Sequence, residues 1–256
     1  SAVVLVPPTL AIVYFGPPYF DGLILLVAAG LSYEWARLCG DGRVQPTGWA
    51  LVVLVVLAVA AAVAGPDRVA AGLLVFGAVG LYFAGRFEEE GKGVWLAGGV
   101  LYVAIPSIAC LWLRENPAAG RDIFFWLLGV VWATDIAAYA FGRTIGGPKL
   151  APRISPNKTW AGLLGAILVA GLAGWGLAEA FTLPTAELLG VLGGGLAIVS
   201  QGGDLGESAI KRHFDVKDTG SLIPGHGGLM DRLDGLLIAA PVVMLVKWTT
   251  GSWVFP

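Results

Sequence analysis

The chain has 256 residues, of which 57% are hydrophobic and only 13% are charged, and its formal net charge is −2. Apolar runs near 20 residues recur along the whole length, and a helix of that length crosses the roughly 30 Å hydrocarbon layer of a membrane. This composition excludes an ordinary soluble domain, and the lack of a period-two alternation argues against a transmembrane barrel. The two cysteines, Cys39 and Cys110, form no CxxC pair and are interpreted as small core residues.

The sequence predicts an all-α polytopic integral membrane protein with about nine transmembrane helices in a single membrane domain, residues 1–256. Residues 1–122 form the N-terminal helices, and residues 123–256 form a catalytic C-terminal half. The first helix is the weakest prediction, because it is short and contains Pro7 and Pro8. In chain order the helices are Ala2–Phe15, Phe20–Leu38, Trp49–Ala64, Arg68–Ala84, Val94–Trp112, Ile123–Phe141, Trp160–Phe181, Ala186–Ser200 and Leu229–Trp248.

The positions of lysine and arginine predict the orientation, because cytoplasmic loops carry an excess of these residues. With nine spans and the N-terminus inside, the bases on the cytoplasmic side are Arg37, Arg43, Arg86, Lys92, Arg143, Lys149, Arg153, Lys158, Lys211, Arg212, Lys217 and Arg232. The bases on the outer side are Arg68, Arg114, Arg121 and Lys247. This bias places the two long connections, Gly142–Thr159 and Gln201–Gly228, in the cytoplasm.

Charge is concentrated between Gly203 and Asp234, in a chain that is otherwise apolar. Placing charge beside hydrocarbon is costly unless the charge is paired or bound to an ion. The stretch contains the acids Asp204, Glu207, Asp215, Asp218, Asp231 and Asp234 and the bases Lys211, Arg212, Lys217 and Arg232. This near balance favours a metal ion together with phosphate groups over a simple basic patch.

Two helical faces are expected within this stretch. If the chain continues as a helix after Ser200, Asp204, Glu207, Ser208 and Lys211 share one face at spacings of three and four. Asp231 and Asp234 share a face at the start of the last helix. Carboxylates at a helix N-terminus are also stabilised by its dipole, so a purely structural role for this pair stays open.

A glycine-rich segment, KDTGSLIPGHGG, lies between these two faces. Its glycines, which include Gly227 and Gly228, allow the backbone N–H groups to approach phosphate oxygens. The Walker pattern is absent, so the segment is not a P-loop. His226 is a phosphate donor candidate, whereas zinc is not expected because the only other histidine is His213. Carboxylates beside phosphates suit Mg²⁺.

The other long connection carries basic and hydroxyl residues that fit an anionic headgroup or a nucleotide. They are Lys149, Arg153, Ser155, Asn157, Lys158 and Thr159. Thr159 is alternatively the N-cap of the next helix. Asp135 lies in the middle of an apolar helix, which makes it a functional candidate by default, although a hydrogen bond to Thr134 or Tyr139 would give it a structural role. Glu34 and Glu179 lie near helix ends and are interpreted as structural.

These residues resemble the signature of the phosphatidate cytidylyltransferase family, also called CDP-diacylglycerol synthases. The matching positions are Ser208, Ile210, Lys211, Arg212, Lys217, Asp218, Gly220, Ile223, Pro224, His226, Gly227, Gly228, Leu229, Asp231, Arg232, Leu233 and Asp234. The segment Leu150–Gly162, the residues around Asp204 and the helix with Asp135 are also similar to that family. The resemblance covers Trp132 to Leu245 well, and the N-terminal half matches only in having several membrane helices.

The resemblance implies transfer of the cytidylyl group of CTP to phosphatidic acid, with Mg²⁺ as the cofactor and a second, monovalent cation as a further candidate. The implied metal ligands are Asp204 and Asp231, with Asp218 and Asp234 as further ligands or as neighbours of ligands. Phosphate contacts are expected from Lys211, Arg212, Lys217 and His226, with Ser208, Gly227, Gly228 and Arg232 beside them. Ser155 and Lys158 contact either the lipid phosphate or the nucleotide. The expected partners are CTP, phosphatidic acid, the lipid bilayer and a second copy in a homodimer, with no nucleic acid.

The expected location is a bacterial-type inner or plasma membrane, and the lysine and arginine bias predicts that the active site faces the cytoplasm. Two alternative functions stay open on the sequence. One is a CTP-dependent polyprenol or phytol kinase, and the other is a membrane transporter with Asp135 on an ion path. A CDP-alcohol phosphotransferase is excluded, because Asp234-Gly235 is followed by Leu236 and Leu237 rather than by the required pattern.

Overall fold

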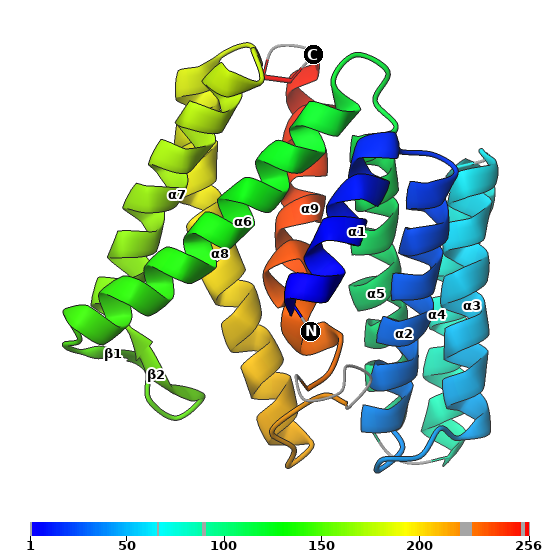
Figure 1. Ribbon diagram of the computed structural model, residues 1–256. Helices are drawn as coiled ribbons and strands as arrows, with labels where there is room; N and C mark the ends of the chain where they lie inside the picture. The colour runs from blue at the N-terminus through cyan, green and yellow to red at the C-terminus, as the bar shows by residue number, and fades with distance from the viewer. Residues whose placement is uncertain (1, 66, 89–90, 221–226, 252–253, 256) are drawn as a thin grey trace. The chain divides into compact units, whose positions relative to one another are not determined.

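The computed structural model describes residues 2–65, 67–88, 91–220, 227–251 and 254–255. Within them the chain is almost entirely helical (Figure 1). The elements are α1 (Ala2–Phe15), α2 (Tyr19–Leu38), α3 (Pro46–Ala64), α4 (Asp67–Glu88), α5 (Lys92–Arg114), α6 (Gly120–Thr144), β1 (Lys149–Ala151), β2 (Ser155–Thr159), α7 (Trp160–Ala180), α8 (Ala186–His213) and α9 (Met230–Thr250).

Each helix expected from an apolar run is present, with ends that differ by a few residues except in α8. That helix was predicted to end at Ser200, and it continues to His213. The prediction was wrong because it followed the end of the apolar run, whereas backbone hydrogen bonds continue through polar residues. The long connection predicted from Gln201 therefore begins only after His213, and Asp204, Glu207, Ser208 and Lys211 are helical.

Among the described residues, seven helices, α3 to α9, are long and apolar enough to cross a membrane. Large apolar side chains on them are exposed, including Phe76 at 79% and Val191 at 75%. A water-soluble surface rarely presents so many large apolar groups, but lipid tails accommodate them. The protein is therefore an integral membrane protein, and the number of spans beyond these seven stays a prediction.

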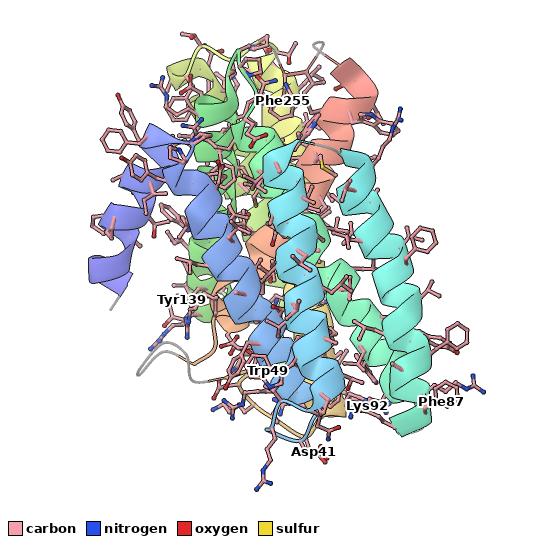
Figure 2. The ribbon with its side chains drawn as sticks, turned by 90° about the vertical axis from the view of Figure 1, so that its right-hand side faces the viewer. Asp41, Trp49, Phe87, Lys92, Tyr139 and Phe255 are labelled. Carbon is pink, nitrogen blue, oxygen red and sulfur yellow. The ribbon has the colours of Figure 1, made fainter. Side chains whose placement is uncertain are left out.

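The chain divides into two compact units, and the first contains Ser1–Leu111 and Phe214–Leu233. Within it α2 packs on α1 and on α3, and α3 packs on α4. Polar residues tie three helix ends together: Thr47 donates to Glu88 Oε2 at 2.9 Å, and Lys92 Nζ pairs with the same oxygen at 2.7 Å. Figure 2 shows Asp41, Phe87 and Lys92 at this end of the unit. Of the predicted cytoplasmic bases, Arg37, Arg86 and Lys92 lie in the end turns of α2, α4 and α5, and Arg43 lies in the connection between α2 and α3.

The second unit contains Trp112–His213 and Asp234–Pro256, and its centre is α7 packed between α6 and α8. Small residues bring α7 and α8 close together. A Cβ atom placed on Gly174 would lie 2.9 Å from Leu189 O, and one on Gly193 would lie 2.6 Å from Ala170 O. Helices in lipid associate through such close backbone contact. Trp126 of α6 adds a hydrogen bond from its indole N–H to Gly174 O at 2.8 Å.

We expect Gly193→Ala to destabilise the second unit, because the added methyl group would overlap the Ala170 carbonyl. Gly195→Ala is the matched control on the same helix, since a Cβ there meets nothing within 4 Å. Thermal unfolding in detergent should show a lower midpoint for Gly193→Ala and an unchanged or higher one for Gly195→Ala. Equal midpoints for the two variants would contradict this account of the α7–α8 contact.

The connection between α6 and α7 contains the antiparallel hairpin β1–β2, in which Lys149 pairs with Thr159 and Ala151 with Ser155. The prediction of a purely helical chain missed this hairpin. The alternative interpretation of Thr159 as a helix cap is confirmed, because its hydroxyl accepts a hydrogen bond from Gly162 N at 3.1 Å at the start of α7. The cap and the hairpin fix Lys158 at the junction between β2 and α7.

Candidate functional site

The predicted site residues fall in both compact units, which are described separately. The first unit contains Lys217, Asp218, Gly227, Gly228, Asp231 and Arg232. The second contains Asp135, Ser155, Lys158, Asp204, Ser208, Lys211, Arg212 and Asp234. His226 lies outside the described residues.

Asp231 is the centre of a hydrogen-bond network in the first unit. It lies in the first turn of α9, where the N–H groups lack partners within the helix and the dipole favours a negative charge. Its Oδ2 atom accepts hydrogen bonds from Thr219 N, Thr219 Oγ1 and Gly228 N, each at 3.0 Å. One carboxylate oxygen thus holds the backbone at Thr219 and at Gly228, near the two ends of the glycine-rich segment.

Glu34 of α2 belongs to the same network, and the sequence analysis missed it. Its side chain accepts hydrogen bonds from Leu229 N at 2.8 Å and Met230 N at 2.9 Å, and its Oε2 lies 3.2 Å from Thr219 Oγ1, whose single proton is shared between Glu34 and Asp231. The residue is only 1% exposed. The available signal was an ionisable side chain in an apolar helix, which normally has a partner, but its place near the helix end favoured a structural interpretation.

A cavity of about 420 Å³ adjoins this network within the first unit. Asp218 and Thr219 line it from the signature, and Arg37 lines it from the last turn of α2. Arg37 Nε donates to Gly42 O at 3.1 Å. The other residues that line the cavity are Leu38, Asp41, Gly42, Phe214, Val216 and Gly220. Lys217 and Arg232, which are neighbours in sequence of Asp218 and Asp231, are exposed.

In the second unit Lys158 forms an ion pair with Asp204 of α8. Lys158 Nζ also lies 3.4 Å from Gln201 O, one turn earlier on the same helix. The charges of Asp135 on α6 and Asp234 on α9 act on each other and on this pair. Asp234 Oδ1 accepts a hydrogen bond from Gly235 N at 2.7 Å. Three carboxylates and one ammonium group from four different elements therefore form one electrostatic cluster.

The predicted face of α8 carries a second ion pair. Lys211 Nζ lies 2.9 Å from Glu207 Oε1, and Glu207 is only 1% exposed. Ser208 is half-buried and Arg212 is exposed on the same helix, while Ser155 is half-buried in β2. The expected face depended on the chain continuing as a helix after Ser200. Because it does, Asp204 and Lys211 lie two turns apart on α8.

Carboxylate oxygens of this kind suit a hard cation such as Mg²⁺. However, no three His, Cys, Asp or Glu side chains form a ready metal-binding group in the part of the chain that the structure describes. The carboxylates instead occur in two sets, Asp231 with Glu34 and Asp218 in the first unit, and Asp135, Asp204 and Asp234 in the second. The identity of the metal ligands therefore stays a prediction.

The chain is similar to known proteins along most of its length. The model of the Cytidylyltransferase family matches residues 1–249. The chain is 39% identical over 252 residues to the phosphatidate cytidylyltransferase of Brucella suis, covering 96% of this chain and 90% of that protein. It is 34% identical to the Pseudomonas aeruginosa protein of the same name, covering 98% and 96%. A Bacillus subtilis protein of that name is 37% identical over 157 residues, 60% of this chain and 57% of its own length. The family match extends over the N-terminal helices, for which the signature gave no specific resemblance.

Proposed function

The chain belongs to the cytidylyltransferase family, and we propose that it transfers the cytidylyl group of CTP to phosphatidate, giving CDP-diacylglycerol and pyrophosphate. The observation that carries this proposal is the hydrogen-bond network around Asp231. It holds the backbone of the signature by hydrogen bonds from Thr219 and Gly228, near the two ends of the glycine-rich segment. The names of the bacterial relatives support phosphatidate as the acceptor.

The chemistry of the two substrates explains why the site is rich in charge. The second pKa of a phosphate monoester is near 6, so phosphatidate is mostly a dianion at neutral pH and needs no general base. One of its oxygens attacks the α-phosphorus of CTP, and the bond from that phosphorus to the departing pyrophosphate breaks. Both reactants are anions, so the protein has to neutralise charge and hold them in line.

We propose that the bases around the signature neutralise the phosphate groups. Lys211, Arg212, Lys217 and His226 contact the phosphates of CTP or pyrophosphate, with Ser208, Gly227, Gly228 and Arg232 beside them. Lys158 and Ser155 contact the lipid phosphate or the nucleotide. The ion pairs of Lys158 with Asp204 and of Lys211 with Glu207 support this assignment, because they hold each ammonium group in place before substrate arrives.

Asp204 and Asp231 are the proposed Mg²⁺ ligands, with Asp218 and Asp234 as further ligands or their neighbours and Asp135 as an outlying member. Bound Mg²⁺ supplies positive charge to the phosphoryl oxygens. The oxygen-only donor set supports this ion over zinc, and a second, monovalent cation is part of the proposal. The carboxylates of Asp135, Asp204 and Asp234 would attract the cation, and the ion pair of Lys158 with Asp204 limits the repulsion among them.

The proposed setting is a bacterial-type inner or plasma membrane crossed by about nine helices, with the polar helix ends in the cytoplasm and with the enzyme acting as a homodimer. The lysine and arginine bias supports this orientation. In the second unit Arg143 lies at the end of α6, and Lys149, Arg153 and Lys158 lie in the hairpin that follows, whereas the opposite end of α6 carries Arg121. CTP would then reach the headgroup from the aqueous side.

The purified protein, incubated with phosphatidate, Mg²⁺ and CTP labelled on either the α- or the γ-phosphate, should give a lipid product that carries only the α-label. The reason is that cytidylyl transfer leaves the β- and γ-phosphates in pyrophosphate. Label from the γ-phosphate in the lipid would instead identify a CTP-dependent lipid kinase. Absence of any labelled lipid, together with ion or solute flux into vesicles, would favour the transporter alternative.

A further inference from the structure

We propose that Glu34 is a positioning residue for the transfer reaction, acting through the first turn of α9 and Thr219 rather than by touching a substrate. The inference rests on the proposed function and deepens it, because it extends the site to α2, outside the signature. Glu34 lies 185 residues before Thr219 and 195 before Leu229 in the chain, so only the fold brings them together.

The hydrogen bonds of Glu34 are directed at the N-terminus of α9. Oε1 accepts from Leu229 N at 2.8 Å, and Oε2 accepts from Met230 N at 2.9 Å. These N–H groups lie before the point at which intrahelical bonding begins, so they need an outside acceptor. A carboxylate from another helix thus caps α9 with both of its oxygens, immediately before Asp231.

Thr219 connects the two carboxylates. Its hydroxyl oxygen lies 3.2 Å from Glu34 Oε2 and 3.0 Å from Asp231 Oδ2, and the residue is only 4% exposed. Asp231 is held in turn by the N–H groups of Thr219 and Gly228. A displacement of Glu34 therefore reaches Asp231 through one hydroxyl group and through the backbone of the helix start.

Two glycines of the signature leave the space that this arrangement requires. A Cβ atom on Gly220 would lie 2.6 Å from Glu34 Oε1. A Cβ atom on Gly228 would lie 2.1 Å from Thr219 Oγ1 and 2.8 Å from Glu34 Oε2. Close packing against Glu34 and Thr219 is thus a second reason for glycine at these two positions, in addition to the expected approach of the backbone to a phosphate group.

The neighbouring residue fixes the position of Glu34 on α2. Trp35 donates from its indole N–H to Trp95 O of α5 at 2.9 Å and is 3% exposed. A Cβ atom on Gly99 would lie 2.3 Å from the Trp35 ring, so α5 is shaped to receive this side chain. Glu34 is therefore attached to a helix whose rotation and height are set by packing, as a positioning role requires.

Glu34→Gln tests the role with almost no change in shape. The glutamine retains one acceptor but points an N–H₂ donor at the other N–H group of α9, so the cap cannot form with both oxygens. A shift of about 1 Å at a reacting centre can reduce turnover about 10²-fold. We expect kcat for CDP-diacylglycerol formation to fall at least about 10-fold, with KM for CTP and phosphatidate changed less than about 3-fold. Amide hydrogen exchange at residues 227–232 should become faster.

The matched control is Glu179→Gln, which changes an exposed glutamate at the end of α7 and should leave kcat and exchange unaltered. Thr219→Val should lower kcat, and Thr219→Ser, which restores the hydroxyl, should recover part of it. Combining Glu34→Gln with Thr219→Val should reduce kcat by less than the product of the two single effects, because both changes break the same connection.

Thermal unfolding separates positioning from a loss of folded protein, since assays well below the unfolding midpoint contain only folded enzyme. Wild-type kcat in Glu34→Gln, or a loss that merely follows the folded fraction, would overturn the inference. Wild-type protein that forms no CDP-diacylglycerol would instead overturn the proposed function. Faster exchange in Glu34→Gln would still report the loss of the cap in that case.

Discussion

Asp231→Asn is expected to reduce CDP-diacylglycerol formation by about 10²- to 10³-fold while the protein still inserts into membranes and unfolds at a similar temperature. An asparagine has the same shape, and its amide oxygen can accept the bonds that Thr219 and Gly228 donate to Oδ2. The substitution therefore removes a negative charge with little change in the network. If Asp231 holds a cation beside the reacting phosphates, that charge is what the reaction needs. Initial rates with α-labelled CTP and detergent-dispersed phosphatidate measure the effect.

Asp215→Asn is the matched control, because it neutralises an exposed acid in the same stretch of chain. Asp215 has a φ of 52°, a backbone conformation that asparagine adopts as readily as aspartate. Its turnover should stay near that of the wild type. Turnover of Asp231→Asn at a similar level would show that Asp231 is only a helix-capping residue, and the metal assignment would be wrong.

The helices were predictable because each one needs a long apolar surface in lipid, and the apolar runs that supply it can be identified directly in the sequence. The prediction failed for a helical segment that continues beyond its apolar run. The continuous apolar run of α8 ends at Ser200, where charged residues and glycines begin to alternate with Leu205, Ala209 and Ile210, although the helix continues to His213. The hairpin β1–β2 was missed for a related reason. Its strands are short, and β2 begins with Ser155 and Pro156, a weak signal for a strand.

The site was predictable only as far as its residues lie close together in the sequence. Gly228 and Asp231 lie within the stretch Gly203–Asp234, and the concentration of charge there, in an apolar chain, marked that stretch as a unit. Glu34 has no such neighbours. Its partnership with Leu229 depends on how α2 packs on the other helices of the first unit, and no spacing within the sequence contains that information. The pair Lys158–Asp204 shows the same limit, because its members were chosen separately and only the structure joins them.

Lys158→Met and Asp204→Asn are each expected to reduce cytidylyl transfer about 10²-fold, for two different reasons. Removing Lys158 leaves Asp204 close to the like charges of Asp135 and Asp234, so the cluster loses the one ammonium group that balances it. Removing the charge of Asp204 takes away a proposed cation ligand. Initial rates and thermal unfolding, measured on the same preparations, give both effects.

A charge reversal separates a structural ion pair from a catalytic one. The double variant Lys158→Asp with Asp204→Lys restores opposite charges, so thermal stability should recover relative to the single variants. Activity should not recover, because the carboxylate then lies in β2 and the ammonium group lies on α8 beside Asp135 and Asp234. The control is the same reversal at the exposed pair Arg121–Asp122, whose N–O distance is 2.9 Å and which contributes little to stability. An ion pair keeps its stabilising effect when its two charges are exchanged, whereas a cation ligand requires its carboxylate at one position. An active Lys158–Asp204 reversal would therefore mean that the pair only connects β2 to α8 and that Asp204 is not a cation ligand.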